Sequence, residues 1–142
     1  MKIWLIAVGE PSLIDQGERL HRTGLMAKYY SENNHNVVLF NSTFFHQKEI
    51  NRFKKTEMRK VNDNLSLIFL RGRDYKRHNL NRIFSNFDNA KSFKEIISDL
   101  EKPDLVLVSF PILELVTEVR KYCLENNIPF IIDIRDFWPD AF

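Results

Sequence analysis

The sequence has 142 residues, which predicts a single domain large enough to bury a core of its own. Its hydrophobic content of 44% is ordinary for a globular protein, and no apolar run approaches the roughly 18 residues of a membrane-spanning helix. The net charge is only +2, and the single cysteine, Cys123, excludes an internal disulfide and fits a reducing compartment such as the cytoplasm.

Apolar runs alternate with segments of helical spacing along the chain. Buried strands are expected at 3–8, 37–40, 65–70, 105–110 and 130–134, because each of these runs is nearly continuously apolar. Helices are expected at 18–33, at 92–100, where Ser92 and Glu95 fit a capping box, and from Ile112 to Cys123. The stretches 41–64 and 71–89 are polar and basic, and we expect long excursions there, the first with one short helix.

This order of elements predicts an α/β fold. Strands that alternate with amphipathic helices form βαβ units and a parallel sheet. Right-handed crossovers then favour a doubly wound, Rossmann-like, mostly parallel sheet of at least five strands, in the order 3-2-1-4-5 when strands are numbered along the chain. Because the strand order reverses between the first and fourth strands, we expect a ligand crevice at their carboxyl ends.

Two loop segments are expected to meet at that crevice. The loop from Gly9 to Gly17 lacks the G-x-G-x-x-G fingerprint, but its two glycines would let the backbone approach a phosphate or a sugar hydroxyl. The alternative is that both glycines only permit the turn. His21, expected in the first turn of the first helix, is either a ligand contact or a surface or packing histidine. The second segment is Ser109 to Pro111.

A third segment, IIDIRDFWP, carries the charged candidates. Asp133 and Arg135 would share one face of the last strand, and a carboxylate there or at Asp136 would serve as a base or as a hydrogen-bond acceptor for a bound hydroxyl. The competing interpretation is structural: Arg135 pairs with a carboxylate and holds the loop in place. Phe137 and Trp138 would either wall a sugar ring or fill the core.

Charge is unevenly distributed along the chain. Between Lys48 and Arg82 there are eleven lysines and arginines and four acidic residues, a net of +7, so the remainder is net −5. This predicts an anionic partner, and the alternative is a pair of solvated, lysine-rich loops. No P-loop, HExxH, CxxC or GxSxG motif is present, the histidines suggest no metal site, and no motif supports a nucleic-acid partner.

Three stretches together carry a family resemblance. KIWLIAVGEPS, followed by GERLHRTGLMAKYYSENNHNVVLF, is similar to a strand, a glycine loop, an R-x-x-x-L-A-like helix and a G-H-x-V segment, with Asn34 in place of the glycine. PDLVLVSFP is similar to PDVIxxSxP, and IPFIIDIRDFWPDAF to PxxxDxRDxWP, with Arg135 where many members have histidine. Over essentially the whole chain they resemble the amino-terminal domain of a GT-B fold glycosyltransferase of family 4, of the type that builds bacterial lipopolysaccharide or capsule.

The resemblance implies the acceptor-side domain of a retaining enzyme, which moves a sugar from a nucleotide-sugar to a saccharide acceptor that we expect to be lipid-linked. No metal or other cofactor is implied. Family enzymes bind the nucleotide-sugar with a second Rossmann-like domain, which has no counterpart in the sequence, so we expect this chain alone to be inactive. The alternative is a non-catalytic partner subunit or binding module of a two-subunit transferase.

The resemblance also implies roles for single residues. Asp136 would be the partner of the acceptor hydroxyl, and Arg135 would orient it or contact phosphate. Glu18 and His21 would help to hold the acceptor. The wall of the cleft would be formed by Gly9–Gly17, Ser109–Pro111 and Asp133–Trp138.

Two surfaces are expected to bind partners. The basic stretch 48–82, with Phe44, Phe45 and Phe53 dipping into the interface, would suit an anionic membrane surface and make the protein peripheral to the membrane. The last strand, FIIDI, would form an apolar sheet edge, so we expect the protein to self-associate as a homo-oligomer.

Overall fold

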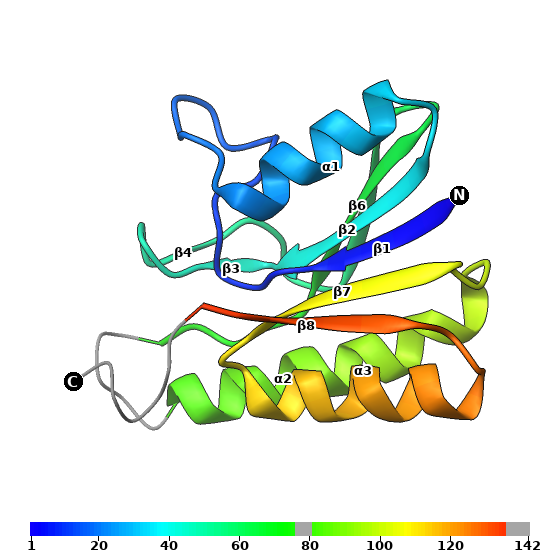
Figure 1. Ribbon diagram of the computed structural model, residues 1–142. Helices are drawn as coiled ribbons and strands as arrows, with labels where there is room; N and C mark the ends of the chain where they lie inside the picture. The colour runs from blue at the N-terminus through cyan, green and yellow to red at the C-terminus, as the bar shows by residue number, and fades with distance from the viewer. Residues whose placement is uncertain (76–80, 136–142) are drawn as a thin grey trace.

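The computed structural model describes residues 1–75 and 81–135 (Figure 1). This part of the chain has an α/β fold built on a six-stranded, mostly parallel sheet in the order β5-β6-β2-β1-β7-β8. Only the β5–β6 pair in this sheet is antiparallel. The strands are β1 (Lys2–Ile6), β2 (Asn36–Ser42), β5 (Glu57–Asn62), β6 (Leu65–Leu70), β7 (Leu105–Phe110) and β8 (Phe130–Ile134).

Helices cover both faces of the sheet, as in a doubly wound fold. α1 (Arg22–Glu32) lies on one face, and α2 (Asn81–Ile96), continued by the short η1 (Ile97–Asp99), lies with α3 (Leu113–Glu125) on the other (Figure 1). A small antiparallel pair, β3 (Phe44–Phe45) and β4 (Ile50–Asn51), follows β2. None of the described helices combines the length and the apolar character needed to cross a membrane.

The five predicted strands correspond to β1, β2, β6, β7 and β8, which lie side by side as β6-β2-β1-β7-β8. The predicted order 3-2-1-4-5 is nevertheless wrong for the sheet as a whole, because it leaves out β5. The excursion predicted at 41–64 contains β3, β4 and β5 and no helix. β5 forms a hairpin with β6 around Asp63 and Asn64, so its strand conformation comes from pairing with a neighbour and not from an apolar pattern of its own.

Two predicted helix starts are wrong. α1 begins at Arg22, not at residue 18, so His21 is its N-cap and not part of its first turn. α2 begins at Asn81, inside the predicted excursion. Ser92 is buried within α2, and its hydroxyl donates to the Arg71 carbonyl at 3.4 Å, so it caps no helix. The expected capping box is therefore wrong, because Ser92 lies in the interior of the protein, where it contacts Arg71.

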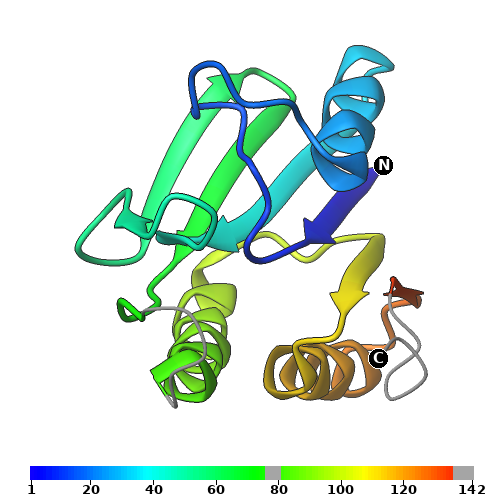
Figure 2. The ribbon, with the colours of Figure 1, turned by 90° about the vertical axis from the view of Figure 1, so that its left-hand side faces the viewer.

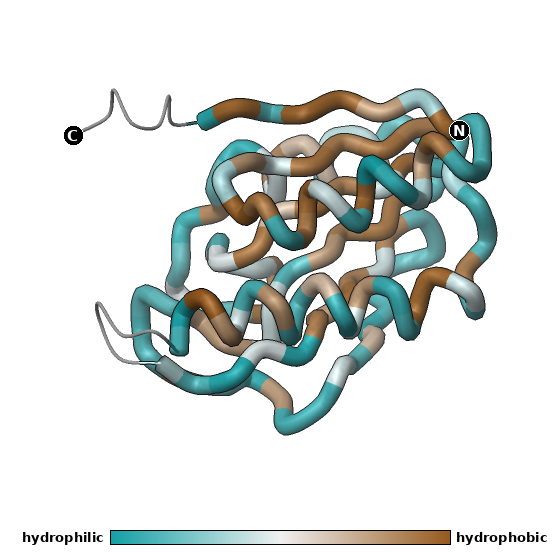
Figure 3. Tube along the Cα trace, turned by 90° about the horizontal axis from the view of Figure 1, so that it is seen from below, coloured by the Kyte–Doolittle hydropathy of each residue, from teal (hydrophilic) through white to brown (hydrophobic). Residues whose placement is uncertain are grey.

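Two apolar layers form the core. Beneath the sheet, aromatic rings of Trp4, Phe40 and Phe93 pack edge to face among residues of α2 and α3. Above the sheet, the small residues Gly24 and Ala27 let α1 lie close to the strands, as predicted. Apolar residues run along the strands in the hydropathy view (Figure 3).

β8 departs from the expectation of a strand covered on both faces. It lies at an edge of the sheet, and Ile131, Ile132 and Ile134 are all exposed in the described part of the protein. The prediction that this strand forms an apolar sheet edge is therefore confirmed.

Candidate functional site

A small pocket opens at the carboxyl ends of the parallel strands, the edge that faces the viewer in Figure 2. Its volume is about 160 Å³. The pocket lies at the carboxyl end of β1, which has β2 on one side and β7 on the other. The strand order reverses at this point, and ligands bind at such points in open α/β sheets. The lining residues are Val8, Gly9, Ser42, Phe44, His46, Tyr75, Arg82, Ser85, Asn86, Asn89, Pro111 and Ile112.

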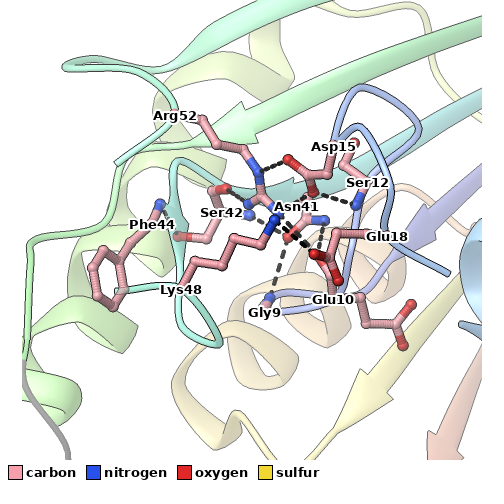
Figure 4. Close-up of polar contacts among 10 residues, drawn as sticks. All are labelled: Gly9, Glu10, Ser12, Asp15, Glu18, Asn41, Ser42, Phe44, Lys48 and Arg52. Carbon is pink, nitrogen blue, oxygen red and sulfur yellow. Dashed lines mark hydrogen bonds and ion pairs between the residues drawn. The ribbon is translucent and has the colours of Figure 1, made fainter. Parts of the chain in front are cut away.

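Asn41, at the end of β2, holds the glycine loop in its position. Its side-chain oxygen accepts hydrogen bonds from the N–H groups of Gly9 (3.2 Å) and Ser42 (2.7 Å), and its amide nitrogen donates to the Glu10 carbonyl (2.9 Å) (Figure 4). Gly9 has a φ of 87°, a backbone conformation that glycine adopts without strain. The predicted role of Gly9 in the wall of the crevice is consistent with this position beside the pocket.

The same loop is fastened from the other side by Arg52, which follows β4. Its guanidinium donates two hydrogen bonds to the Asp15 carboxylate, at 2.8 and 2.5 Å, and others to the carbonyls of Ser42 (2.9 Å) and Glu10 (3.2 Å) (Figure 4). Burial alone would raise the pKa of the Asp15 carboxyl, but the hydrogen bonds from Arg52 and from the Ser12 N–H outweigh it and hold that pKa below its usual value.

The floor of the pocket is a buried polar layer. Asn89 of α2 donates to the Arg71 carbonyl at 2.8 Å and to the Ser42 hydroxyl at 3.3 Å. Gly72 lies so close to this layer that a Cβ there would come within 2.7 Å of the hydroxyls of Ser42 and Ser85. The layer is therefore rigid, with its hydrogen bonds largely satisfied inside the protein.

Three further polar residues, His46, Tyr75 and Arg82, line the pocket. His46 stacks on Tyr75, with ring centroids 5.4 Å apart, and its Nδ1 is buried without a hydrogen-bond partner among the described residues. Burial raises the pKa of the Tyr75 phenol, and the nearby Arg82 only partly offsets this effect. Arg82 forms no ion pair with a described residue. Among the described residues, a cation, an imidazole and a phenol therefore lie together in the lining of the pocket.

A second polar cluster joins the end of β8 to α1 and to the loop after β1. Arg135 donates to the carboxylates of Glu10 and Asp133 and to the Thr23 hydroxyl, and Arg22 donates to both oxygens of Asp133, at 2.9 and 2.8 Å. Arg135 directly follows β8, and its Nε lies 3.3 Å from Asp133 Oδ2, so the two side chains are neighbours as the predicted shared face requires. Both carboxylates of the cluster are ion-paired with arginine, as the structural interpretation of Arg135 expects.

The remaining sequence candidates lie elsewhere. Glu18 forms an ion pair with Lys48 at 2.6 Å, and neither it nor the exposed Gly17 lines the pocket. His21 lines an open groove along α1, away from the pocket. The Ser109 hydroxyl is buried without a hydrogen-bond partner among the described residues, and this serine pairs in register with Asp133. Asp136, Phe137 and Trp138 lie outside the described residues.

Sequence reasoning missed most of the lining of the pocket. Ser42 lines the pocket, and with its neighbours Asn41 and Thr43 it directly follows the apolar run 37–40. Polar residues at the carboxyl end of a buried strand are the signal that could have found it. His46, Tyr75 and Arg82 carried no such signal, because they come from the two stretches interpreted as excursions. No group of three or more metal-ligating side chains occurs within residues 1–75 and 81–135.

No protein-family model matches the chain, and no curated protein matches it. The glycosyltransferase resemblance therefore rests on the three sequence stretches alone. What the described geometry supplies is a small pocket of mixed lining, in which hydrogen-bonding side chains such as Arg82, Asn86 and His46 lie beside the apolar side chains of Val8, Phe44 and Ile112.

Proposed function

We propose that the chain is the acceptor-binding, amino-terminal domain of a retaining GT-B glycosyltransferase of family 4 that acts in bacterial surface polysaccharide synthesis. The observation that supports this most directly is the pocket at the carboxyl ends of β1, β2 and β7, the edge at which the sequence resemblance expects the acceptor. Sugar hydroxyls need several donors and acceptors in a small concave site, and Arg82, His46 and Asn86 supply them here.

In this proposal the pocket holds the acceptor saccharide while a nucleotide-sugar donor approaches from a second Rossmann-like domain. The acceptor hydroxyl oxygen forms a bond to the anomeric carbon, and the bond from that carbon to the diphosphate breaks. Asp136 is assigned as the hydrogen-bond acceptor for that hydroxyl. Arg135, which binds Glu10 and Asp133, is assigned to orient this segment or to contact phosphate.

The test measures the binding of a ligand to the whole chain by nitrogen-15 NMR. The probe is N-acetylglucosamine linked by a diphosphate to citronellol, a short, water-soluble mimic of a lipid-linked acceptor. Amide shifts are expected at Gly9, His46 and Asn86. Arg82→Gln should weaken binding by about tenfold, the effect of losing one charged hydrogen bond. Arg59→Gln, on the far edge strand β5, is the matched control and should leave the affinity unchanged. Shifts spread over the surface, or an Arg82→Gln affinity equal to that of the control, would overturn the proposal.

A non-catalytic partner subunit is the second candidate. It is favoured by the ion pairing of Glu10 and Asp133, which leaves neither carboxylate of that cluster free to act as a base. Genome context separates the two candidates. A neighbouring gene for a Rossmann-like nucleotide-sugar domain supports the two-subunit transferase, whereas a reading frame that continues into such a domain supports a single-chain enzyme.

A lipid-linked acceptor would place the protein on an anionic membrane surface through the basic stretch 48–82. Phe44 and Phe45 are buried, so the expected insertion of these two rings is wrong, whereas Phe53 is half-buried against Phe69 and its insertion stays a prediction. Lys54 and Lys55 are exposed and form no ion pair with a described residue, so they remain as contacts. The fraction of protein that sediments with phosphatidylglycerol vesicles should fall as the salt concentration rises, and it should be lower for the double variant Lys54→Gln/Lys55→Gln. If the protein does not bind these vesicles even at low salt, this part of the proposal is wrong.

A further inference from the structure

The side chains that line the pocket beside Gly9 include no carboxylate. Its twelve lining residues contain one arginine, Arg82, and one histidine, His46, but neither aspartate nor glutamate. A concave site lined by charge of one sign concentrates ligands of the opposite sign. The lining of this pocket therefore favours an anion over a neutral or cationic ligand.

The acidic residues that neighbour the pocket along the chain have partners elsewhere. Three of them are adjacent in sequence to lining residues, and each binds a side chain that does not line the pocket: Glu10 binds Arg135, Asp74 binds Asn51 and Asp88 binds Arg73. Arg82 is not ion-paired with any of the described carboxylates. Within the part of the chain that the structure describes, the positive charge in the pocket is thus not cancelled by a paired carboxylate.

Hydrogen-bond donors accompany this charge. Burial raises the pKa of the Tyr75 phenol, so the phenol keeps its proton at neutral pH and donates. Tyr75 is held between Phe44 and His46, with ring centroids at 4.6 and 5.4 Å. The Ser42 hydroxyl accepts from the Phe44 N–H at 3.1 Å (Figure 4) and from Asn89 at 3.3 Å, and no described residue accepts its own proton. These donors suit a ligand that carries several acceptor oxygens.

The volume of the pocket limits which part of a ligand it takes. Sites for drug-sized molecules have volumes of about 300–1,000 Å³, whereas this pocket measures about 160 Å³. It is therefore too small for a saccharide of several rings and suits a single compact group. The apolar side chains of Val8 and Ile112 also line it, and a site with fewer waters strengthens the attraction between Arg82 and an anion.

We propose that this pocket binds a phosphoryl group, with Arg82, Tyr75 and His46 as its ligands. A phosphoryl group combines negative charge with three acceptor oxygens, so a guanidinium, a phenol and an imidazole can all donate to it at once. A carboxylate has two oxygens in one plane and fits three separate donors less well. In the proposed transferase this group is the phosphate that joins the acceptor saccharide to its carrier, so the saccharide is held through it. That last assignment rests on the proposed function, whereas phosphoryl binding itself does not.

The first experiment compares probes that differ in the phosphoryl group. Nitrogen-15 NMR of the whole chain follows titrations at constant ionic strength with inorganic pyrophosphate, N-acetylglucosamine 1-phosphate, N-acetylglucosamine and glucuronate. Pyrophosphate and the sugar phosphate should shift the amides of His46, Asn86 and Ile112. Both should bind about tenfold more tightly than the neutral sugar and glucuronate, the effect of one charged hydrogen bond. Equal affinity for N-acetylglucosamine with and without its phosphate, or equal affinity for glucuronate, overturns the inference.

Substitutions then test the assigned ligands. Arg82→Gln and Tyr75→Phe should each weaken pyrophosphate binding by about three- to tenfold, and Arg82→Lys should lose less than Arg82→Gln because it keeps the charge. Tyr29→Phe, at an exposed tyrosine of α1, is the matched control and should bind as the wild type does. Circular dichroism spectra equal to that of the wild type show that the variants are folded. Wild-type affinity of Arg82→Gln overturns the inference, and wild-type affinity of Tyr75→Phe overturns the role of the phenol.

The two proposals can fail separately. If pyrophosphate binds in the pocket but the diphosphate-linked acceptor mimic binds no more tightly than pyrophosphate, the phosphoryl site is supported and the acceptor assignment is wrong. If the mimic and N-acetylglucosamine bind equally well while pyrophosphate does not bind, the pocket takes the sugar and the phosphoryl inference is wrong.

Discussion

Arg52 and Asp15 form a buried ion pair that fastens the loop after β1 to the segment after β4. Their side chains are 4% and 10% exposed, and the guanidinium Nη2 lies 2.5 Å from the carboxylate Oδ2. The guanidinium also lies over the ring of Phe45, 4.3 Å from its centroid. A charge buried to this extent is stable only because hydrogen bonds and a π-face replace its water.

Removal of one partner of this pair should be strongly destabilising. Arg52→Met leaves the Asp15 carboxylate buried without its cation, so the free energy of unfolding should fall by about 3–5 kcal/mol. The double variant Arg52→Met/Asp15→Asn should lose less than the sum of the two single losses, because it leaves no unpaired charge. Urea denaturation measures all four proteins. Additivity within about 0.5 kcal/mol would show that the pair is not coupled.

Acid sensitivity should follow from the lowered pKa of Asp15. Because the folded-state pKa lies below the unfolded value of about 3.9, the carboxylate contributes stability above the unfolded pKa and loses it as the pH falls through the folded pKa. Between about pH 5 and pH 3 the wild type should therefore lose more stability than Asp15→Asn. Urea midpoints at several pH values measure the difference, and parallel curves for the two proteins would contradict it.

Substitution of Gly72 or Gly9, two glycines near the pocket, should destabilise the protein for different reasons. A Cβ at Gly72 would lie 2.7 to 2.8 Å from side-chain atoms of Ser42, Ser85 and Asn89, so Gly72→Ala should cost about 1–3 kcal/mol through overpacking. Gly9 has free space around it but a φ of +87°, so Gly9→Ala should cost about 1–2 kcal/mol through backbone strain.

Asparagine separates these two causes. It tolerates the left-handed region, so Gly9→Asn should be more stable than Gly9→Ala. At Gly72 the larger side chain should be worse than alanine. Thermal unfolding of the four variants gives the ranking, and the same order at both sites would refute one of the two explanations.

Cys123 should be unreactive in the folded protein. Burial raises the pKa of its thiol to about 11, so almost no thiolate exists at neutral pH. A thiol reagent such as DTNB at pH 8 should leave the native chain unmodified and label one thiol after unfolding in urea. Rapid labelling of the native protein would mean that α3 does not hold this residue in the core.

The strands of the sheet could be predicted because their signal is local. The runs at 65–70, 105–110 and 130–134 coincide with β6, β7 and β8. β6 and β7 lie inside the mostly parallel sheet, where a buried strand is apolar along its own length, and β8 is apolar although it lies at the edge. β5 and the first half of α2 could not be predicted in this way. β5 is exposed and exists because β6 offers a partner, and the polar residues Ser85 and Asn89 of α2 are buried because they meet the end of β2.

The sequence predicted where the candidate site lies but not which residues line it. The reversal of strand order pointed to the carboxyl edge, where the pocket lies beside Gly9. His46, Tyr75 and Arg82 carry no pattern that distinguishes them from other polar residues of the same stretches. Asp133 and Arg135 were found from the strand end, yet their partners Glu10 and Arg22 were not.

By itself the sequence determined the five segments that form β1, β2, β6, β7 and β8, that helices cover both faces of the sheet, and which edge carries the loops that meet at the site. These properties follow from hydrophobic periodicity and chain chirality, which act over short distances along the chain. Only the tertiary structure decided that Arg52 neutralises Asp15, 37 residues away, and that Arg135 binds Glu10, 125 residues away. The reason is that the partner of a buried charge is the group that lies next to it in the folded state, and no local sequence pattern indicates which group that is.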